Sequence, residues 1–199
     1  MDVRAVVKAE SRLKLAERAA ADLDGLEHDY FSDRWYEFLV ALKNVWTVLE
    51  QGAKTTPQSR QWYGTKAAER RGDELLQYLY EARNDDEHGL EPVVKFARGY
   101  TAIGVNKQDF SQSMRFDGVI GGPAGTSLKV TSLDGKPVLV EQAPDRTLLA
   151  SIRPRGRPEM QPPQKHLGKE LLDAAPTAVA SHALGYMRQL VAEARSRTA

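Results

Sequence analysis

The stretch SDRWYEFLVALKNVWTVLEQG, residues 32–52, decides the fold because it has the clearest helical pattern in the chain. Its apolar residues recur at spacings of three and four, which places them on one face of an α-helix. Ser32 stands where an N-cap is expected, and Gly52 stands where the helix would end. The pattern predicts a long amphipathic helix whose buried stripe is Trp35, Phe38, Leu39, Leu42, Val45, Trp46 and Leu49.

Helical patterns continue on both sides of this stretch. Residues 3–23 are rich in alanine and leucine, and Gly25 ends that run. Thr56 and Pro57 match the cap and the first position of a third helix. Asp73 can cap a fourth helix, which contains ELLQYLYEAR. The N-terminal half of the chain therefore predicts a helical bundle.

In residues 99–152 the spacing of apolar residues no longer follows the period of a helix. They form short β-rich runs separated by Gly, Asp and Pro, and Asp134-Gly135 suits a tight hairpin turn. Residues 153–164 are a proline-rich, basic connection without regular structure. A helical pattern resumes at about His166, where Pro176 either breaks the helix or begins a second one. Its apolar stripe is Val179, Ala183, Tyr186, Met187, Leu190 and Ala194.

The expected fold class is mainly α, an antiparallel helical bundle with a small antiparallel β segment and a C-terminal helix. The predicted boundaries are 1–98 for the bundle, 99–165 for the β segment with its proline-rich linker, and 166–199 for the C-terminal helix. Helices before and after the sheet can pack together, which would make the β segment an insertion on one helical body.

Composition narrows the function classes. The chain has 199 residues, a net charge of +1 and no cysteine. Without cysteine, disulfides, thiolate catalysis and cysteine-ligated metal sites are excluded. No run approaches the roughly 18 apolar residues of a membrane span. We expect a soluble cytoplasmic protein with no membrane partner, and any nucleic-acid binding must come from a local patch.

The stretch EARNDDEHG, residues 81–89, is the best candidate for chemistry. Arg83 follows the apolar stripe of its helix, so its guanidinium needs an anionic partner close to the core. His88 lies five positions later, which is about 140° around a straight helix. The two side chains can share a site only if the helix bends near Asn84 and Asp85, or if two chains contribute.

An ordinary helix ending explains the same residues. A histidine in the last turn is favoured by the helix dipole, and Gly89 is a common helix stop. Arg83 can pair with an acid such as Glu87. Consecutive acids followed by His88 do not form a metal-ligand pattern, so no metal and no cofactor are expected.

The order Arg83, Asn84, then His88 after a short interval resembles the signature of HEPN-domain proteins. The resemblance covers residues 1–98 at most. It implies a helical bundle that forms a homodimer, with two copies of the motif lining one cleft. Catalytic members are metal-independent endoribonucleases, some acting as toxins with a neighbouring antitoxin or other partner protein. Other members are non-catalytic modules for dimerisation or partner binding.

Under this resemblance, His88 would exchange a proton with the RNA 2′-hydroxyl or with the leaving oxygen. Arg83 would stabilise charge on the phosphate, and Asn84 would orient the histidine or the phosphate. Acids around the motif should repel RNA, namely Glu81, Asp85, Asp86, Glu87 and Glu91. Compensating substrate-binding cations are expected upstream at Lys66, Arg70 and Arg71, and also at Arg153, Arg155 and Arg157.

Two other features have plainer interpretations. Trp62 and Tyr63 beside Arg60 can stack a base, but their position at a helix start favours a place in the core. The glycine-rich residues 121–125 lack the lysine and the following helix of a phosphate loop, so a β-turn is the better prediction.

Overall fold

The structure is a computed structural model that describes residues 1–26, 28–88, 92–104, 114–122, 125–132, 139–154 and 156–198. At residues 28, 29, 87, 88 and most of 102–141 it describes the backbone alone. These residues form two compact units. One comprises Met1–Phe96 with Thr147–Ala199, and the other comprises Ala97–Arg146.

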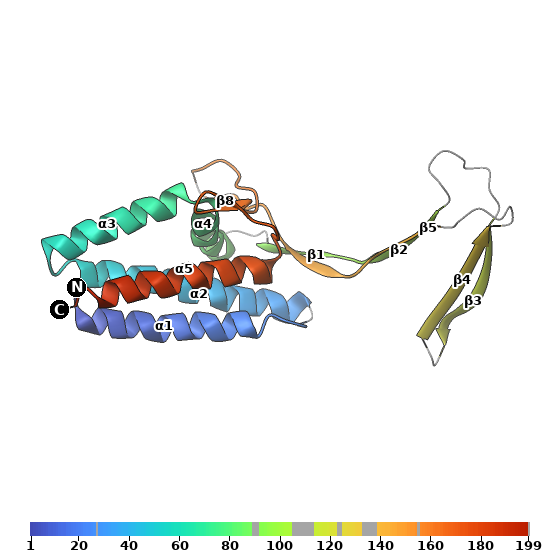
Figure 1. Cartoon of the computed structure of the whole chain (residues 1–199), viewed down its shortest axis with the longest axis horizontal. Coiled ribbons are helices and arrows are strands. Elements are labelled where there is room, and N and C mark those ends of the chain that lie inside the picture. The colour runs from blue at the N-terminus through green and yellow to red at the C-terminus, as the bar shows by residue number, and fades with distance from the viewer. Residues whose placement is uncertain are drawn as a thin grey trace. The chain divides into compact units, whose positions relative to one another are not determined.

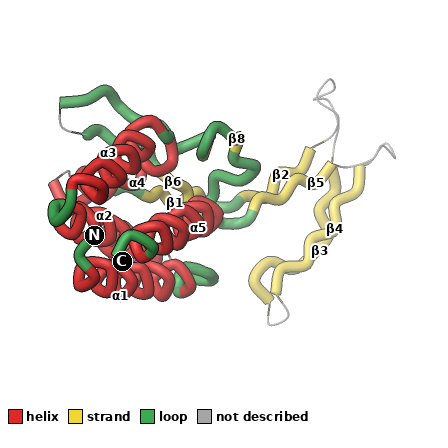
Figure 2. Tube along the Cα trace, turned by 60° about the vertical axis from the view of Figure 1, so that its left-hand side comes forward, coloured by secondary structure: helices red, strands yellow, loops and turns green. Residues whose placement is uncertain are grey.

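The first unit is built from the α-helices of the described chain. They are α1 (Val3–Ala21), α2 (His28–Ala53), α3 (Pro57–Gly72), α4 (Glu74–His88) and α5 (Pro176–Arg195). Helix α1 packs along α2 and α5, while α3 and α4 pack on α2 (Figure 1). The two chain ends lie side by side, and the Met1 amino group donates to the Arg197 carbonyl oxygen at 3.1 Å (Figures 1 and 2).

The predicted stripe of α2 is confirmed, because all seven of its residues are buried in the core of this unit. The prediction that Ser32 caps this helix is wrong, since α2 begins at His28. Phe31 extends the stripe by one turn, and its ring stacks on Trp35 at 6.3 Å between centroids. Burial of that extra aromatic side chain favours helix at residues where a serine would otherwise favour a cap.

The predicted starts of α3 and α4 are confirmed. The Thr56 hydroxyl accepts from the Ser59 backbone N–H at 3.2 Å, and Pro57 is the first residue of α3. The Asp73 carboxylate accepts from the Leu76 backbone N–H at 2.8 Å, which caps α4. The C-terminal stripe on α5 is also buried. The fold class is therefore as predicted: mainly α, with small antiparallel strand pairs and a C-terminal helix.

The prediction of a helix from about His166 is wrong, since α5 begins at Pro176. Residues Lys165–His166 (β7) and Lys169–Glu170 (β8) form a short antiparallel hairpin. Its turn has positive φ at Leu167 (49°) and Gly168 (75°), the backbone geometry that tight hairpin turns require. The turn stays in this form because the Leu167 N–H donates to the Asp73 carboxylate at 2.6 Å.

The remaining strands form two-stranded pairs. Strand β1 (Val94–Ala97) pairs with β6 (Arg146–Leu149). Within the second unit, β2 (Tyr100–Gly104) pairs antiparallel with β5 (Leu139–Ala143), and β3 (Met114–Gly122) pairs antiparallel with β4 (Gly125–Ser132). The predicted turn at Asp134-Gly135 lies outside the described residues, as do Pro123 and Ala124 of the glycine-rich stretch.

Gly52 is required where α1 crosses α2. A Cβ at this position would overlap the Ala5 Cβ and lie 3.1 Å from the Met1 sulfur. We expect Gly52→Ala to lower the free energy of unfolding by about 1–2 kcal/mol, because the strain exceeds the gain in helix propensity. Urea unfolding followed by circular dichroism measures this change.

Gly64→Ala is the matched control, because a Cβ at Gly64 in α3 would meet nothing within 4 Å. There the substitution should raise the free energy of unfolding by up to about 1 kcal/mol through helix propensity alone. Equal effects at the two glycines would contradict a close approach at Gly52.

Candidate functional site

Helix α4 contains the whole Arg83–His88 motif. It is continuous from Glu74 to His88, so the bend near Asn84 that would bring Arg83 and His88 together is not formed. The two positions remain about 140° apart around the helix. The side chain of His88, and residues Gly89 to Glu91, lie outside the part that the structure describes. The alternative hypothesis, that two chains contribute Arg83 and His88 to one shared site, is compatible with this spacing.

Asn84 is held at both ends of its amide. Its Oδ1 accepts from the Lys43 ammonium of α2, and its Nδ2 donates to Glu81 at 3.2 Å. Arg83 is half-buried and interacts with its surroundings, so it is not an isolated cation. The motif is thus tied to α2 through a lysine that the sequence pattern did not indicate.

Tyr80, one turn before Asn84, brings a second cation to this side of α4. The Lys43 nitrogen lies 5.4 Å from the centre of the Tyr80 ring, and the Arg70 guanidinium of α3 lies 3.8 Å from it. Arg70 also lies 4.9 Å from the Trp46 ring. Cations over aromatic faces are attracted by the ring quadrupole, which stabilises the positive charge without neutralising it. We call Lys43, Arg70, Tyr80 and Asn84 the cationic cluster.

Two of the acids expected to repel RNA are engaged by neighbouring groups, and one of them, Glu81, also accepts from the Asn84 amide of the cationic cluster. Glu81 accepts from Gln77 at 2.9 Å and pairs with Arg157 at 3.1 Å. Asp85, one turn later, accepts from the Arg153 backbone N–H at 3.1 Å. Arg153 and Arg157 therefore contact acids of α4, the first through its backbone N–H and the second through its guanidinium, while Arg155 lies outside the described residues.

Two further acids have different surroundings. Burial, and to a lesser degree the neighbouring charge of Asp85, raise the pKa of Asp86. The raised pKa means that these surroundings disfavour the charged form of Asp86. Glu87 and Glu91 lie outside the described side chains.

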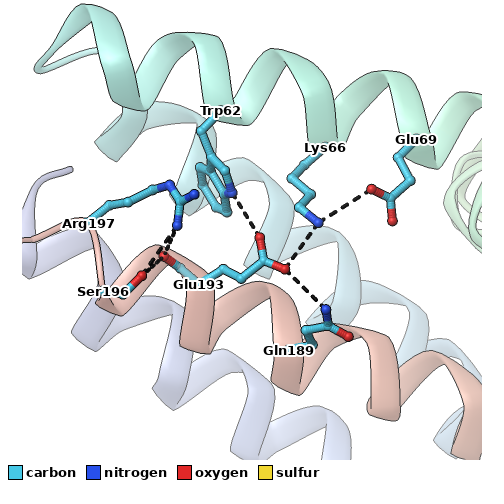
Figure 3. A network of polar contacts seen from close by, with 7 residues as sticks. All are labelled: Trp62, Lys66, Glu69, Gln189, Glu193, Ser196 and Arg197. Atoms are coloured by element: carbon cyan, nitrogen blue, oxygen red, sulfur yellow. Dashed lines mark hydrogen bonds and ion pairs between the residues drawn. The ribbon is translucent and has the colours of Figure 1, made fainter.

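The three upstream basic residues, Lys66, Arg70 and Arg71, have different surroundings in the structure. Lys66 pairs with Glu193 of α5 at 3.2 Å and with Glu69 at 3.4 Å (Figure 3). Its charge is therefore compensated between α3 and α5. Arg70 reaches the cationic cluster, whereas the exposed Arg71 lines a groove between α2 and α3. Of the predicted substrate-binding cations, Arg70 is the one that the fold brings to the motif.

Trp62 belongs to the core, as predicted. Its indole N–H donates to Glu193 at 3.1 Å, and its exposure is 8% (Figure 3). Tyr63 is half-buried, and its hydroxyl donates to the Trp46 carbonyl oxygen at 3.3 Å. Neither aromatic side chain is a free stacking platform at the motif.

Glu193 should make stability depend on acid pH. Burial would raise the pKa of Glu193, but hydrogen bonds from Trp62 and Lys66 and the charge of Lys66 outweigh it, so the pKa lies below its ordinary value of 4.5. A carboxylate with a lowered folded pKa stabilises the fold above the unfolded pKa, and this contribution disappears as pH falls through the folded pKa. We expect Glu193→Gln to cost about 1 kcal/mol at pH 7 and progressively less below about pH 4.5.

Chemical denaturation at a series of pH values measures that difference. Glu170→Gln is the control, because Glu170 pairs with Lys165 at 3.4 Å while 74% exposed. A constant cost of Glu193→Gln from pH 7 to pH 3 would contradict the assignment.

A second cluster of titratable groups lies at the start of α4. The buried Asp73 carboxylate meets His166 Nδ1 at 3.0 Å, in addition to the backbone N–H groups of Leu76 and Leu167. The His166 ring lies edge-on to Tyr186 at 6.0 Å. The His166 side chain is only 11% exposed, and it holds the β7–β8 hairpin against α4.

Within the described residues, no three carboxylate or imidazole side chains cluster as ligands for a metal ion. None of the helices seen in the structure combines the length and apolar character needed to cross a bilayer. Comparison with protein-family models, curated proteins and solved structures finds no match to the chain. The HEPN resemblance accordingly rests on residues 83–88 and on the helical context.

Proposed function

We propose that this chain is a HEPN-like, metal-independent endoribonuclease that acts as a homodimer. The observation that supports the proposal is the cationic cluster. Lys43 of α2 contacts Asn84, and both Lys43 and Arg70 of α3 lie over Tyr80, on the helix that contains the motif. Positive charge from two other helices beside α4 would favour the binding of a phosphate there.

The proposed reaction is an internal transfer on RNA. His88 accepts the proton of the 2′-hydroxyl, and the 2′-oxygen attacks the adjacent phosphorus. The bond from phosphorus to the 5′-oxygen breaks, and this oxygen takes a proton from water, which leaves a 2′,3′-cyclic phosphate and a 5′-hydroxyl. His88 then returns its proton to the solvent. Arg83, with Lys43 and Arg70, stabilises the negative charge that develops on the phosphate oxygens. The Lys43–Asn84 hydrogen bond fixes the direction of the asparagine amide.

The homodimer follows from the spacing of the motif on a straight helix. Because Arg83 and His88 are on different sides of α4, one chain would supply the arginine and its partner the histidine of each site. A neighbouring antitoxin or other partner protein would inhibit such an enzyme by covering the shared cleft.

A second candidate function is a non-catalytic HEPN-like module for dimerisation or partner binding. The observation that favours it is the saturation of Asn84, whose amide is bonded to Lys43 and Glu81. In a module, this network would stabilise α4 against α2 and would have no role in chemistry.

Metal-free cleavage of RNA tests the proposal. The purified protein is incubated in EDTA with an RNA oligonucleotide and with the same oligonucleotide carrying a 2′-deoxy sugar at the cleaved position. We expect cleavage of the first alone, with a cyclic phosphate at the new 3′ end. A protein that forms a dimer but cleaves no RNA supports the module, and cleavage that requires a divalent metal contradicts the mechanism.

A further inference from the structure

A groove of about 560 Å³ lies between α2 and α3, apart from the cationic cluster. Its volume falls within the range of sites that bind small molecules or segments of a larger ligand. The groove has an apolar floor with charged residues around it. It is lined by Glu50, Ala53, Lys54, Arg60, Tyr63, Gly64, Ala67 and Arg71.

The charge of this groove is predominantly positive. Lys54, Arg60 and Arg71 contribute three cations against the single carboxylate of Glu50. None of the three cations forms an ion pair with a carboxylate of the described residues. A second groove of about 520 Å³, between α1 and α2, is less positive, because its Arg12, Arg18 and Arg34 are offset by two carboxylates, Asp22 and Glu37. Both of these carboxylates pair with Arg34, Glu37 at 2.5 Å and Asp22 at 3.8 Å.

Three further residues of the groove between α2 and α3 favour open space and positive charge in it. A Cβ at Gly64 would meet nothing within 4 Å, so the wall of α3 leaves space there. The Arg60 guanidinium donates to the Lys54 carbonyl oxygen at 3.3 Å, which holds it near the end of α2. Burial raises the pKa of Tyr63 to about 12, so its phenol remains neutral at physiological pH and adds no negative charge.

The groove is linked to Tyr80 of α4 by packed side chains. Tyr63 meets Trp46 edge-on at 6.2 Å, and Trp46 lies 4.9 Å from Arg70. Arg70 in turn lies 3.8 Å from Tyr80 of α4. Because Trp46 is buried, this link runs through the core, and a polyanion that leaves the groove toward α4 would follow the surface of α3.

We propose that the groove lined by Lys54, Arg60, Tyr63 and Arg71 is an accessory site for the backbone of single-stranded RNA. This inference rests on the proposed function, because it assigns a second contact surface to the same substrate. The guanidinium groups of Arg60 and Arg71 match phosphate oxygens, and a positively charged groove is typical of sites that follow the backbone of a single strand. The site contributes affinity and direction but takes no part in the reaction.

Fluorescence anisotropy with a 5′-fluorescein-labelled twelve-nucleotide oligouridylate tests the site. All proteins contain His88→Ala, so that the probe stays intact. The groove variant combines Lys54→Ala, Arg60→Ala and Arg71→Ala. The matched control combines Lys8→Ala, Lys14→Ala and Arg18→Ala, three exposed cations of α1 that do not line this groove.

We expect the groove variant to bind at least about tenfold more weakly near 100 mM salt, with a salt slope smaller by about 2. The control should change affinity less than about twofold. Equal losses in groove and control variants would overturn the site, as would an unchanged affinity of the groove variant. Tighter binding of a duplex RNA, or displacement of the probe by polyglutamate at equal charge, would overturn its assignment to single-stranded RNA.

Cleavage assays separate this inference from the proposed function. The same groove substitutions are placed in the chain with His88 intact. If RNA is cleaved and neither its binding nor its cleavage at low RNA concentration depends on the groove, the accessory site is wrong and the ribonuclease stands. If oligouridylate binding depends on the groove but no RNA is cleaved, the site stands and the ribonuclease is wrong.

Discussion

His88→Ala is expected to lower the rate of metal-free RNA cleavage by a factor of about 100 to 10,000, the usual contribution of a general acid–base group. Under the proposed mechanism, His88 is the residue that accepts the proton of the 2′-hydroxyl. The substitution removes that acceptor at the end of α4 and leaves the helical core intact. Initial rates of cleavage, measured by gel electrophoresis in EDTA, give the factor.

His182→Ala is the matched control, because His182 is exposed on α5 and lies outside the cationic cluster. Its cleavage rate should equal that of the parent. If His88→Ala cleaves RNA at the parent rate, the proposed mechanism is contradicted.

A mixture of two inactive variants tests whether two chains share each site. Arg83→Ala and His88→Ala proteins should each be inactive alone. In a mixed dimer, one site would combine Arg83 of the second protein with His88 of the first, so mixing should restore cleavage. No recovery after subunit exchange would show that each site is built within one chain.

Asp73→Ala is expected to give the largest loss of stability among these substitutions. The Asp73 carboxylate caps α4 through Leu76 and also binds the Leu167 N–H and His166. Removing it leaves the backbone N–H of Leu167 without its side-chain acceptor and breaks the contact between α4 and the β7–β8 hairpin. We expect a loss of about 3 kcal/mol in the free energy of unfolding, from one buried cap and two partly buried hydrogen bonds.

Two further variants separate the causes of that loss. Asp73→Ser keeps a side-chain cap for α4 without reaching the hairpin, and should recover about 1 kcal/mol relative to alanine. Asp173→Ala removes an exposed carboxylate that accepts from the Ala175 N–H at 2.8 Å, and should change stability by less than about 0.5 kcal/mol. A similar cost for Asp73→Ala and Asp173→Ala would contradict the role of the buried carboxylate. Both measurements use urea unfolding.

Helices with a strong local signal could be predicted from the sequence. The stripe from Trp35 to Leu49 is buried as expected, and Thr56, Pro57 and Asp73 occupy the expected positions at helix starts. Periodicity and capping depend on residues within one or two turns of each other, so the pattern contains what is needed to predict them.

The hairpin at His166 could not be predicted in this way. Its turn places Leu167 at a positive φ, which a leucine seldom adopts by preference. The conformation depends on the Asp73 carboxylate, 94 positions earlier in the chain, which binds the Leu167 N–H. A contact between residues so far apart in the sequence produces no periodic pattern of apolar residues around residue 166.

The candidate site was predicted in part. The sequence placed Arg83, Asn84 and His88 together in the last turns of one helix, and it indicated Lys66, Arg70 and Arg71 as cations nearby. Arg70 and Arg71 are adjacent on α3 and therefore point about 100° apart. One consequently meets Tyr80, while the other lines the groove between α2 and α3. Lys66 instead pairs with Glu193 of a helix more than a hundred residues later.

By itself, the sequence determined the helical body, most of its helix starts and the position of the Arg83–His88 motif on α4, because each of these depends on neighbouring residues. The tertiary structure decided which charges surround that motif. Lys43 is 41 positions from Asn84, and it reaches the Asn84 amide because α2 packs against α4. Pairing between side chains of different helices depends on how those helices pack, and local periodicity does not specify that packing.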